Sequence, residues 1–285
     1  RSDGGKQHPR RGEREANRIH PGDGDGQSAH HAGLHRRAGA EAQGAAGSAA
    51  PGKWDAFDGQ AFPEFVDDPA HYEDGLYTHV IKPFKIPWHW TRVVSFDHGY
   101  TRPFSFGVWA VDEEERVYRY KELYGCVPGE ANVGVTCPPG EIARQLADLM
   151  EPEFEEGIHV CGIADPAIWD SSRGERIYET ALRRRVYFTK GDNRRIPGWM
   201  QMHYRMAFDA EGYPQLYVFS NCRAFIRTIP GLLFSETEPE DLDTRMEDHV
   251  ADESRYLCMA RPIPPRRVET ALPVQDDPLN MLVRR

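Results

Sequence analysis

The middle of the chain carries three consecutive strand-like runs, and the first of them ends on an aspartate. Residues 91–96 are rich in β-forming side chains and lead into Asp97, with Gly99 shortly after, which is typical of a strand that enters a turn. Residues 104–111 and 116–124 are the next two runs, and a polar turn separates them. We therefore expect three antiparallel strands, with Asp97 at the end of the first.

A helix and a further strand follow, and this strand also ends on an aspartate. Residues 138–150 begin with two prolines and place their large apolar side chains on one helical face. Residues 158–164 are an apolar run that predicts a buried strand with Asp165 at its carboxyl end. Ligands of open α/β sheets gather at such strand ends, so Asp165 is a candidate site residue.

A third acidic motif, residues 248–252, lies in a segment with helical character. His249 and Asp252 are three residues apart, which puts both side chains on one face of a helix. An aspartate on the first strand, a second after a later parallel strand and a third on a late helix are the arrangement of the RNase H-like fold. We expect an α/β protein with an RNase H-like mixed sheet, three antiparallel strands followed by parallel strands, flanked by helices. Weaker patterns predict helices over 177–182, 198–206 and 222–229 and strands over 186–188 and 216–219.

Six motifs occur in the order and approximate spacing seen in phage terminase large subunits. They resemble the C-terminal nuclease domain of those DNA-packaging motors, over about residues 52–260, and the last motif is the most telling. The motifs are Trp54-Asp55-Ala56-Phe57-Asp58-Gly59-Gln60-Ala61-Phe62, Ile86-Pro87-Trp88-His89-Trp90, Asp97-His98-Gly99, Glu122-Leu123-Tyr124-Gly125, Ala164-Asp165-Pro166 and Asp248-His249-Val250-Ala251-Asp252-Glu253-Ser254-Arg255-Tyr256.

The resemblance implies a metal-dependent endonuclease that cuts concatemeric double-stranded phage DNA with two Mg²⁺ or Mn²⁺ ions. Carried over by position, Asp97, Asp165 and Asp252 would bind the ions, and His249 would support them. Carboxylate oxygens suit such hard cations, and two ions can stabilise both the attacking and the leaving oxygen of a phosphodiester. His249 would orient or deprotonate the attacking water, or tune a metal ligand.

Each main acid also has a purely structural interpretation. Asp97 could be a turn residue, and Asp165 could start a turn or cap the next helix. Asp252 could pair with Arg255 on the helix surface. Their joint occurrence in a strand, strand and helix order, within the longer match to one family, favours the functional interpretation.

Two further acids are secondary candidates for the site. Asp248 lies in the third motif, and its alternative is a surface acid. Glu122 lies on an alternating strand, and its alternative is a residue that faces solvent.

The charge of the chain is unevenly distributed. A formal net charge of -10 is unfavourable for DNA binding, because phosphate contacts come mostly from Lys and Arg. One basic cluster stands against this balance, and it either contacts the DNA backbone or is a solvated helix end. The cluster consists of Arg183, Arg184, Arg185, Lys190, Arg194 and Arg195.

The composition predicts three segments. Residues 1–50 contain Ile19 and Leu34 as their large aliphatic residues, so we expect a disordered low-complexity segment, or a wrongly assigned gene start. Residues 51–260 would form the nuclease domain, and residues 261–285 a flexible Pro-rich tail. A complete large terminase also needs a phosphate-binding loop of the form G-x-x-x-x-G-K-[ST], which does not occur here.

The expected environment and partners follow from composition and resemblance. No run approaches the roughly 18 apolar residues of a membrane span. The five cysteines show no C-x-x-C spacing, which favours reduced thiols over the alternative of a zinc site. We expect a phage or prophage protein in the host-cell cytoplasm, and the resemblance implies a terminase small subunit, a portal and an ATPase motor as partners.

Two other classes of function stay open. Another RNase H-like nuclease, such as a resolvase or a transposase, would share the carboxylates without the tryptophan-containing motifs. A catalytically silent packaging or docking fragment is the other alternative, and metal-dependent cleavage would distinguish it from the two nuclease classes.

Overall fold

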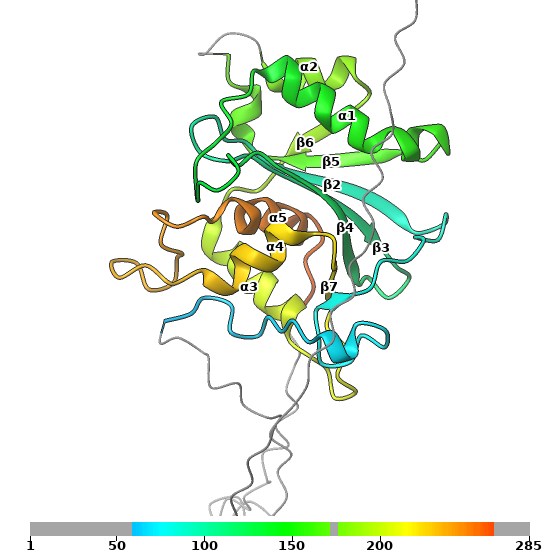
Figure 1. Ribbon diagram of the computed structural model, residues 1–285, viewed down its shortest axis with the longest axis vertical. Helices are drawn as coiled ribbons and strands as arrows, with labels where there is room; N and C mark the ends of the chain where they lie inside the picture. Colours follow the sequence, from blue (N-terminus) through cyan, green and yellow to red (C-terminus); the bar gives the residue numbers. More distant parts are fainter. Residues whose placement is uncertain (1–58, 172–175, 265–285) are drawn as a thin grey trace, which may run out of the picture. The chain divides into compact units, whose positions relative to one another are not determined.

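A seven-stranded mixed sheet, with helices on both faces, forms the centre of the computed structural model, which describes residues 59–171 and 176–264 (Figure 1). The strand order is β1-β7-β4-β3-β2-β5-β6. The β2–β3 and β3–β4 pairs are antiparallel, and the other four pairs are parallel. The strands are β1 (Val80–Ile81), β2 (Thr91–Asp97), β3 (Ser105–Val111), β4 (Val117–Tyr124), β5 (Val160–Ala164), β6 (Tyr187–Lys190) and β7 (Leu216–Phe219).

The helices divide between the two faces of the sheet. Figure 1 shows α1 and α2 on one face and α3, α4 and α5 on the other. Helix α1 begins at a proline, whose fixed φ suits the first helical position, and Gly157 follows its last turn with a φ of 72°. The helices are α1 (Pro139–Glu155), α2 (Ile177–Arg183), α3 (Arg195–Met206), α4 (Arg223–Thr228) and α5 (His249–Ala260), with 3₁₀ turns at Pro69–His71, Pro166–Trp169 and Ile229–Gly231.

The register of β2 and β5 places the carboxyl ends of both strands side by side, and we call this end of the sheet the carboxyl edge. Phe96 pairs with Ala164, and the backbone N–H of Asp165 donates to the carbonyl of Phe96 at 2.9 Å. Asp97 and Asp165 each follow one of these paired residues. Main-chain hydrogen bonds therefore bring the two aspartates side by side, although 68 positions separate them in the sequence.

A buried polar network fixes α5 against the sheet. Glu253 is fully buried and pairs with Arg119 of β4, which is also fully buried. Its carboxylate also accepts hydrogen bonds from Ser95 of β2, from Ser105 at 3.2 Å and from Trp109 Nε1 at 3.1 Å. A buried charge is tolerated only when it is paired and hydrogen-bonded in this way. The network therefore joins α5 to the three antiparallel strands.

The predicted RNase H-like mixed sheet is confirmed, with small differences at the ends of elements. Helix α3 begins at Arg195, three residues before the predicted start, because Pro197 is tolerated in a first helical turn. Strand β1 was not predicted, because two residues are too few to show a period of two. Within residues 59–171 and 176–264, no helix has the length and apolar composition needed to cross a membrane.

Some of the sequence predictions concern residues outside the described ranges. The predicted disorder of residues 1–50 and the motif residues Trp54–Asp58 are among them. The predicted tail also lies outside them from residue 265 onward.

Candidate active site

Helix α5 brings a second pair of predicted residues to the edge where β2 and β5 end. His249 is the first residue of α5, and its Nδ1 lies 3.3 Å from Oδ2 of Asp97. Asp252 lies one turn further along, and its charge acts on both Asp97 and Asp165. The structure thus brings together all four residues that the sequence analysis proposed as the main site.

The imidazole of His249 is held from both sides. Asn132 donates its amide nitrogen to the carbonyls of Arg245 at 3.2 Å and Met246 at 3.0 Å, so its Oδ1 faces His249. That oxygen lies 3.1 Å from Nε2 of His249, which must therefore donate a proton. Asn132 was missed by the sequence analysis. Its φ of 59° is a turn conformation that asparagine tolerates, and nothing in the local sequence links it to a distant histidine.

Burial and mutual repulsion change the titration of these groups. Burial raises the pKa of Asp97 to about 7, opposed by the hydrogen bond to His249 and reinforced by the charge of Asp252. Burial also raises the pKa of Asp165 and of Asp248, and the charge of Asp252 adds to both shifts. Burial alone would lower the pKa of His249, but the hydrogen bond to Asp97 and the neighbouring carboxylates raise it above its usual value. Burial and the charge of Asp252 therefore both favour the protonated form of the neighbouring acids.

Two arginines donate hydrogen bonds to the carboxylate of Asp252. Arg195 Nη1 lies 3.0 and 2.8 Å from its two oxygens, and Arg255 Nε lies 2.6 Å from Oδ1. The same guanidinium of Arg195 reaches Oδ2 of Asp248 at 3.1 Å. The structural interpretation of Asp252, a pair with Arg255, is thus realised in the same conformation that places this acid in the cluster.

Asp165 also has a local partner. Its Oδ1 accepts from the backbone N–H of Ala167 at 2.9 Å and caps the 3₁₀ turn that follows β5. The capping role that the sequence left open is therefore present, alongside the position of Asp165 next to Asp97.

The donor types of this cluster fit a hard divalent cation. Carboxylate oxygens are the ligands that Mg²⁺ and Mn²⁺ prefer, and buried acids with raised pKa values are stabilised by an added positive charge. In the described residues, no three His, Cys, Asp or Glu side chains are arranged to hold a metal ion as they lie. Asp252 faces arginines and Asp165 caps its own turn, so a cation would require these two carboxylates to turn toward Asp97.

The secondary candidates have different positions. Asp248 is buried beside Arg195 at the start of α5, so it is not the surface acid of the alternative interpretation. Glu122 accepts hydrogen bonds from the backbone N–H groups of Ala224 at 2.6 Å and Phe225 at 3.3 Å, and from Arg119. Glu122 thus binds the first turn of α4, and it neither faces solvent nor contacts the acids described above.

The predicted basic cluster is divided by the structure. Lys190 ends β6 and pairs with Ala164 of β5, so it lies at the same sheet edge as Asp165. Arg194 is exposed and bound to Asp192, whereas Arg195 is held by carboxylates. Arg183, Arg184 and Arg185 are exposed at the end of α2.

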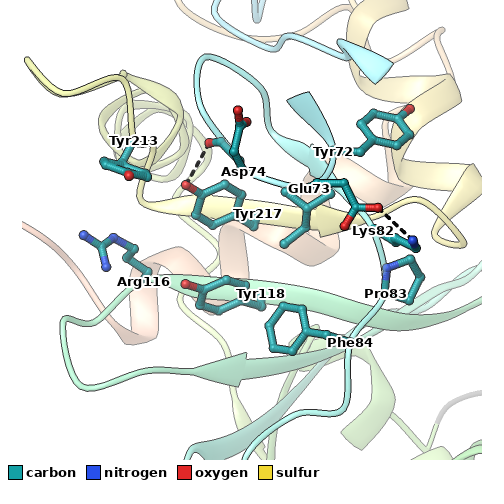
Figure 2. A pocket seen from close by; sticks show the side chains of 12 residues that line it. Tyr72, Glu73, Asp74, Lys82, Pro83, Phe84, Arg116, Tyr118, Tyr213 and Tyr217 are labelled. Atoms are coloured by element: carbon teal, nitrogen blue, oxygen red, sulfur yellow. Dashed lines mark hydrogen bonds and ion pairs between the residues drawn. The ribbon is translucent and has the colours of Figure 1, made fainter. Parts of the chain in front are cut away.

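A separate cavity of about 500 Å³ lies over β4 and β7, and it contains none of the predicted site residues (Figure 2). Tyr118 and Tyr217 line it with stacked rings whose centroids are 5.2 Å apart. The Tyr217 hydroxyl donates to the carbonyl of Gly75 at 3.1 Å, and Lys82 pairs with Glu73 at 2.7 Å. The hydrogen bond from Tyr217 thus ties the segment before β1 to β7 at the wall of this cavity.

Comparison with known proteins supports the fold assignment. The large terminase of a thermophilic bacteriophage, in complex with ATP-gamma-S, matches with a TM-score of 0.54 and 19% sequence identity, over 72% of this chain and 46% of that one. The same terminase in complex with ADP matches with a TM-score of 0.51 and 20% identity, over 63% and 41% of the two chains. The nuclease domain of the P22 large terminase has a TM-score of 0.49 and 14% identity, over 67% and 91%.

The chain has an RNase H-like fold that is similar to part of a phage large terminase. It spans less than half the length of the thermophilic phage protein. No protein-family model matches the sequence, and no curated protein matches it.

Proposed function

We propose that the chain is a metal-dependent DNA endonuclease that acts in phage genome packaging. The observation that carries this proposal is the main-chain register that sets Asp97 beside Asp165, with Asp252 and His249 of α5 directed at the same edge. An acid cluster at the carboxyl ends of parallel strands, in a fold shared with a large terminase, is the site that phosphodiester hydrolysis would use.

The cluster would act on one phosphate of the DNA backbone. Two Mg²⁺ or Mn²⁺ ions, when bound, would neutralise that phosphate and supply an activated water. Asp97, Asp165 and Asp252 would provide the oxygen ligands, and Asp248 stands next to them. While no cation is bound to Asp97, the contact with this acid would keep a proton on His249. With a cation bound to Asp97, His249 would be able to accept a proton.

The DNA backbone would approach along β6, the outer strand of the sheet next to β5. Lys190 lies beside the end of β5, and its ammonium is 5.7 Å from the ring centre of Trp169. The exposed arginines at the end of α2 precede β6, so they lie near the amino end of this edge strand. The position of Lys190 beside the acids supports a DNA contact for this residue, and Arg183, Arg184 and Arg185 would contact the DNA backbone at the other end of β6. Arg195 would pair with the acids instead.

The proposed partners follow from the likeness to a packaging terminase. Double-stranded concatemeric DNA would be the substrate, and a motor ATPase, a terminase small subunit and a portal would be the partners. Packaging of phage genomes takes place in the host cytoplasm, which is where we place the protein. A tether to the motor would raise the local concentration of an acidic domain at the DNA.

Nicking of supercoiled plasmid by the full chain tests this proposal. We expect cleavage with Mg²⁺ or Mn²⁺, none with EDTA, and a loss of about a hundredfold or more for Asp97→Asn, Asp165→Asn and Asp252→Asn. Glu122→Gln is the matched control, because this carboxylate binds α4. Cleavage that survives the three substitutions would refute the assignment, and a folded chain that binds Mn²⁺ without cutting would favour the silent fragment.

Cleavage of a synthetic four-way DNA junction distinguishes a packaging endonuclease from a junction resolvase. Preferential cutting of the junction over linear duplex would favour a resolvase. Equal or better cutting of long duplex DNA supports the packaging function.

A further inference from the structure

Arg195 has an unusual position for a residue of a basic run. It begins α3, yet its guanidinium contacts carboxylates of three residues from two other segments. Its Nε lies 2.9 and 3.0 Å from the two oxygens of Asp241, while Nη1 and Nη2 reach Asp252 and Asp248. Its side chain is 25% exposed, so these contacts lie within reach of solvent and ions.

We propose that Arg195 is a built-in counterion of the acid cluster, which divalent cations must displace from Asp252 and Asp248. This inference rests on the proposed function, because it assumes that the cluster binds such cations. Asp248 precedes α5 and Asp252 lies in its first turn, four residues later, and two carboxylates at this spacing repel each other. One planar guanidinium between them reduces that repulsion, which an ammonium group could do less well.

The competition follows from the atoms that are occupied. Both oxygens of Asp252 accept from Arg195, and Oδ1 also accepts from Arg255. A cation ligated by these oxygens would lie close to the Arg195 guanidinium, and the two positive charges would repel each other. Arg195 would therefore have to leave Asp252 before the carboxylate could turn toward Asp97.

Arg195 keeps a partner when it leaves. Asp241 is fixed by Trp199 Nε1 at 2.7 Å and by the N–H of Leu242 at 2.8 Å, independently of Asp252. The guanidinium also lies over the Trp199 ring, with 5.0 Å between its central carbon and the ring centre. Release from Asp248 and Asp252 would leave Arg195 paired with Asp241 and free to meet a DNA phosphate with its two terminal nitrogens.

Binding of Mn²⁺ to the full-length chain, followed by electron paramagnetic resonance of the free ion, tests the proposal. Arg195→Gln should bind Mn²⁺ about tenfold more tightly than the unmodified chain, because one opposing charge is gone. Arg144→Gln is the matched control, since Arg144 also bridges two carboxylates, Glu141 and Asp148, but on exposed α1. It should leave Mn²⁺ affinity unchanged.

A second variant guards against a folding defect. Arg195→Lys keeps the charge but cannot hold three carboxylates with one ammonium group, so it should also bind Mn²⁺ more tightly than the unmodified chain. Circular dichroism in EDTA establishes which variants are folded. The rise in melting temperature on adding Mn²⁺ should be larger for either folded variant than for the unmodified chain.

The outcomes separate this inference from the proposed function. Equal or weaker Mn²⁺ binding by the folded Arg195 variants would overturn the counterion and leave the nuclease proposal standing. Absence of Mn²⁺ binding from every protein, the Arg195 variants included, would overturn both. Tighter binding by the variants, abolished when Asp97→Asn is added, supports both.

Discussion

Asn132 fixes the orientation of His249, and that limits its chemistry. Its Oδ1 makes Nε2 a donor, so Nδ1 faces Oδ2 of Asp97 and one proton lies between these two groups. While Asp97 occupies Nδ1, the imidazole has no nitrogen left to accept a proton from water. A general base role for His249 therefore depends on another positive charge at Asp97.

The raised pKa of Asp97 predicts how stability varies with pH in EDTA. The folded-state pKa of about 7 lies above the unfolded value, so the folded protein keeps a proton that the unfolded chain releases between about pH 4 and pH 7. The free energy of unfolding should fall as pH rises through that window. The raised pKa of His249 acts in the same direction at higher pH, because its contribution is lost as the imidazolium deprotonates.

Asp97→Asn should remove this dependence. We expect the variant to be more stable than the unmodified chain at pH 8 by on the order of 2 kcal/mol, with a smaller difference at pH 5. Urea unfolding at the two pH values measures the difference, with the exposed acid of Asp148→Asn as control. An identical pH slope for Asp97→Asn and the unmodified chain would contradict the buried, raised acid.

At the level of elements, α5 depends on a glycine in the strand it covers. A Cβ at Gly107 of β3 would lie 2.3 Å from Oε1 of Glu253 and 2.4 Å from Nη1 of Arg119. Both groups belong to the fully buried network. The glycine is therefore a requirement of the packing between β3 and α5.

Gly107→Ala should lower the free energy of unfolding by about 1 to 3 kcal/mol, because the added methyl group overpacks this network. The measurement is urea unfolding at constant pH. Gly140→Ala in the first turn of α1 is the matched control, since its Cβ would meet no atom within 4 Å. A loss for Gly107→Ala no greater than that of the control would show that the network can shift.

Most elements were predictable because their signals are local. Periodicity and turn residues located the strands that end at Asp97 and Asp165, and the prolines located the start of α1. The partner of Arg195 was not predictable, because a run of basic residues gives no sign that one member turns to acids 57 positions away. The sequence pattern also does not distinguish Asp252 from Glu253, although Asp252 lies in the acid cluster and Glu253 lies in the core. The functional roles of the site residues stay predictions.

At the scale of the whole molecule, a net charge of -10 is combined with a few exposed cations along β6. Repulsion between the acidic surface and DNA weakens binding at all sites, so the few exposed cations near β6 should dominate what affinity exists. Acids that already pair with arginines within the fold contribute little to this repulsion. DNA should therefore bind in one orientation, with its backbone along the edge that holds Lys190.

Replacement of Lys190 and Arg184 by glutamine should weaken DNA binding and lower its salt dependence. We expect the slope of log affinity against log salt to fall by about one for each phosphate contact that is lost. Fluorescence anisotropy of a labelled duplex in EDTA at several salt concentrations measures this. Lys82→Gln is the control, because Lys82 follows β1, the outer strand on the other side of the sheet from β6. An equal effect from it would argue against a localised DNA surface.

The two adjacent acids of α5 also determine the rotational phase of that helix. Apolar faces alone tolerate a helix that turns by one residue, about 100° about its axis, because neighbouring buried side chains can exchange places. Here such a turn would separate Glu253 from Arg119 and leave a buried guanidinium without its partner, at a cost of about 3 to 5 kcal/mol. The ion pair in the core thus fixes the rotation of α5 about its axis, and this keeps Asp252 on the side of the helix that is next to the strand ends.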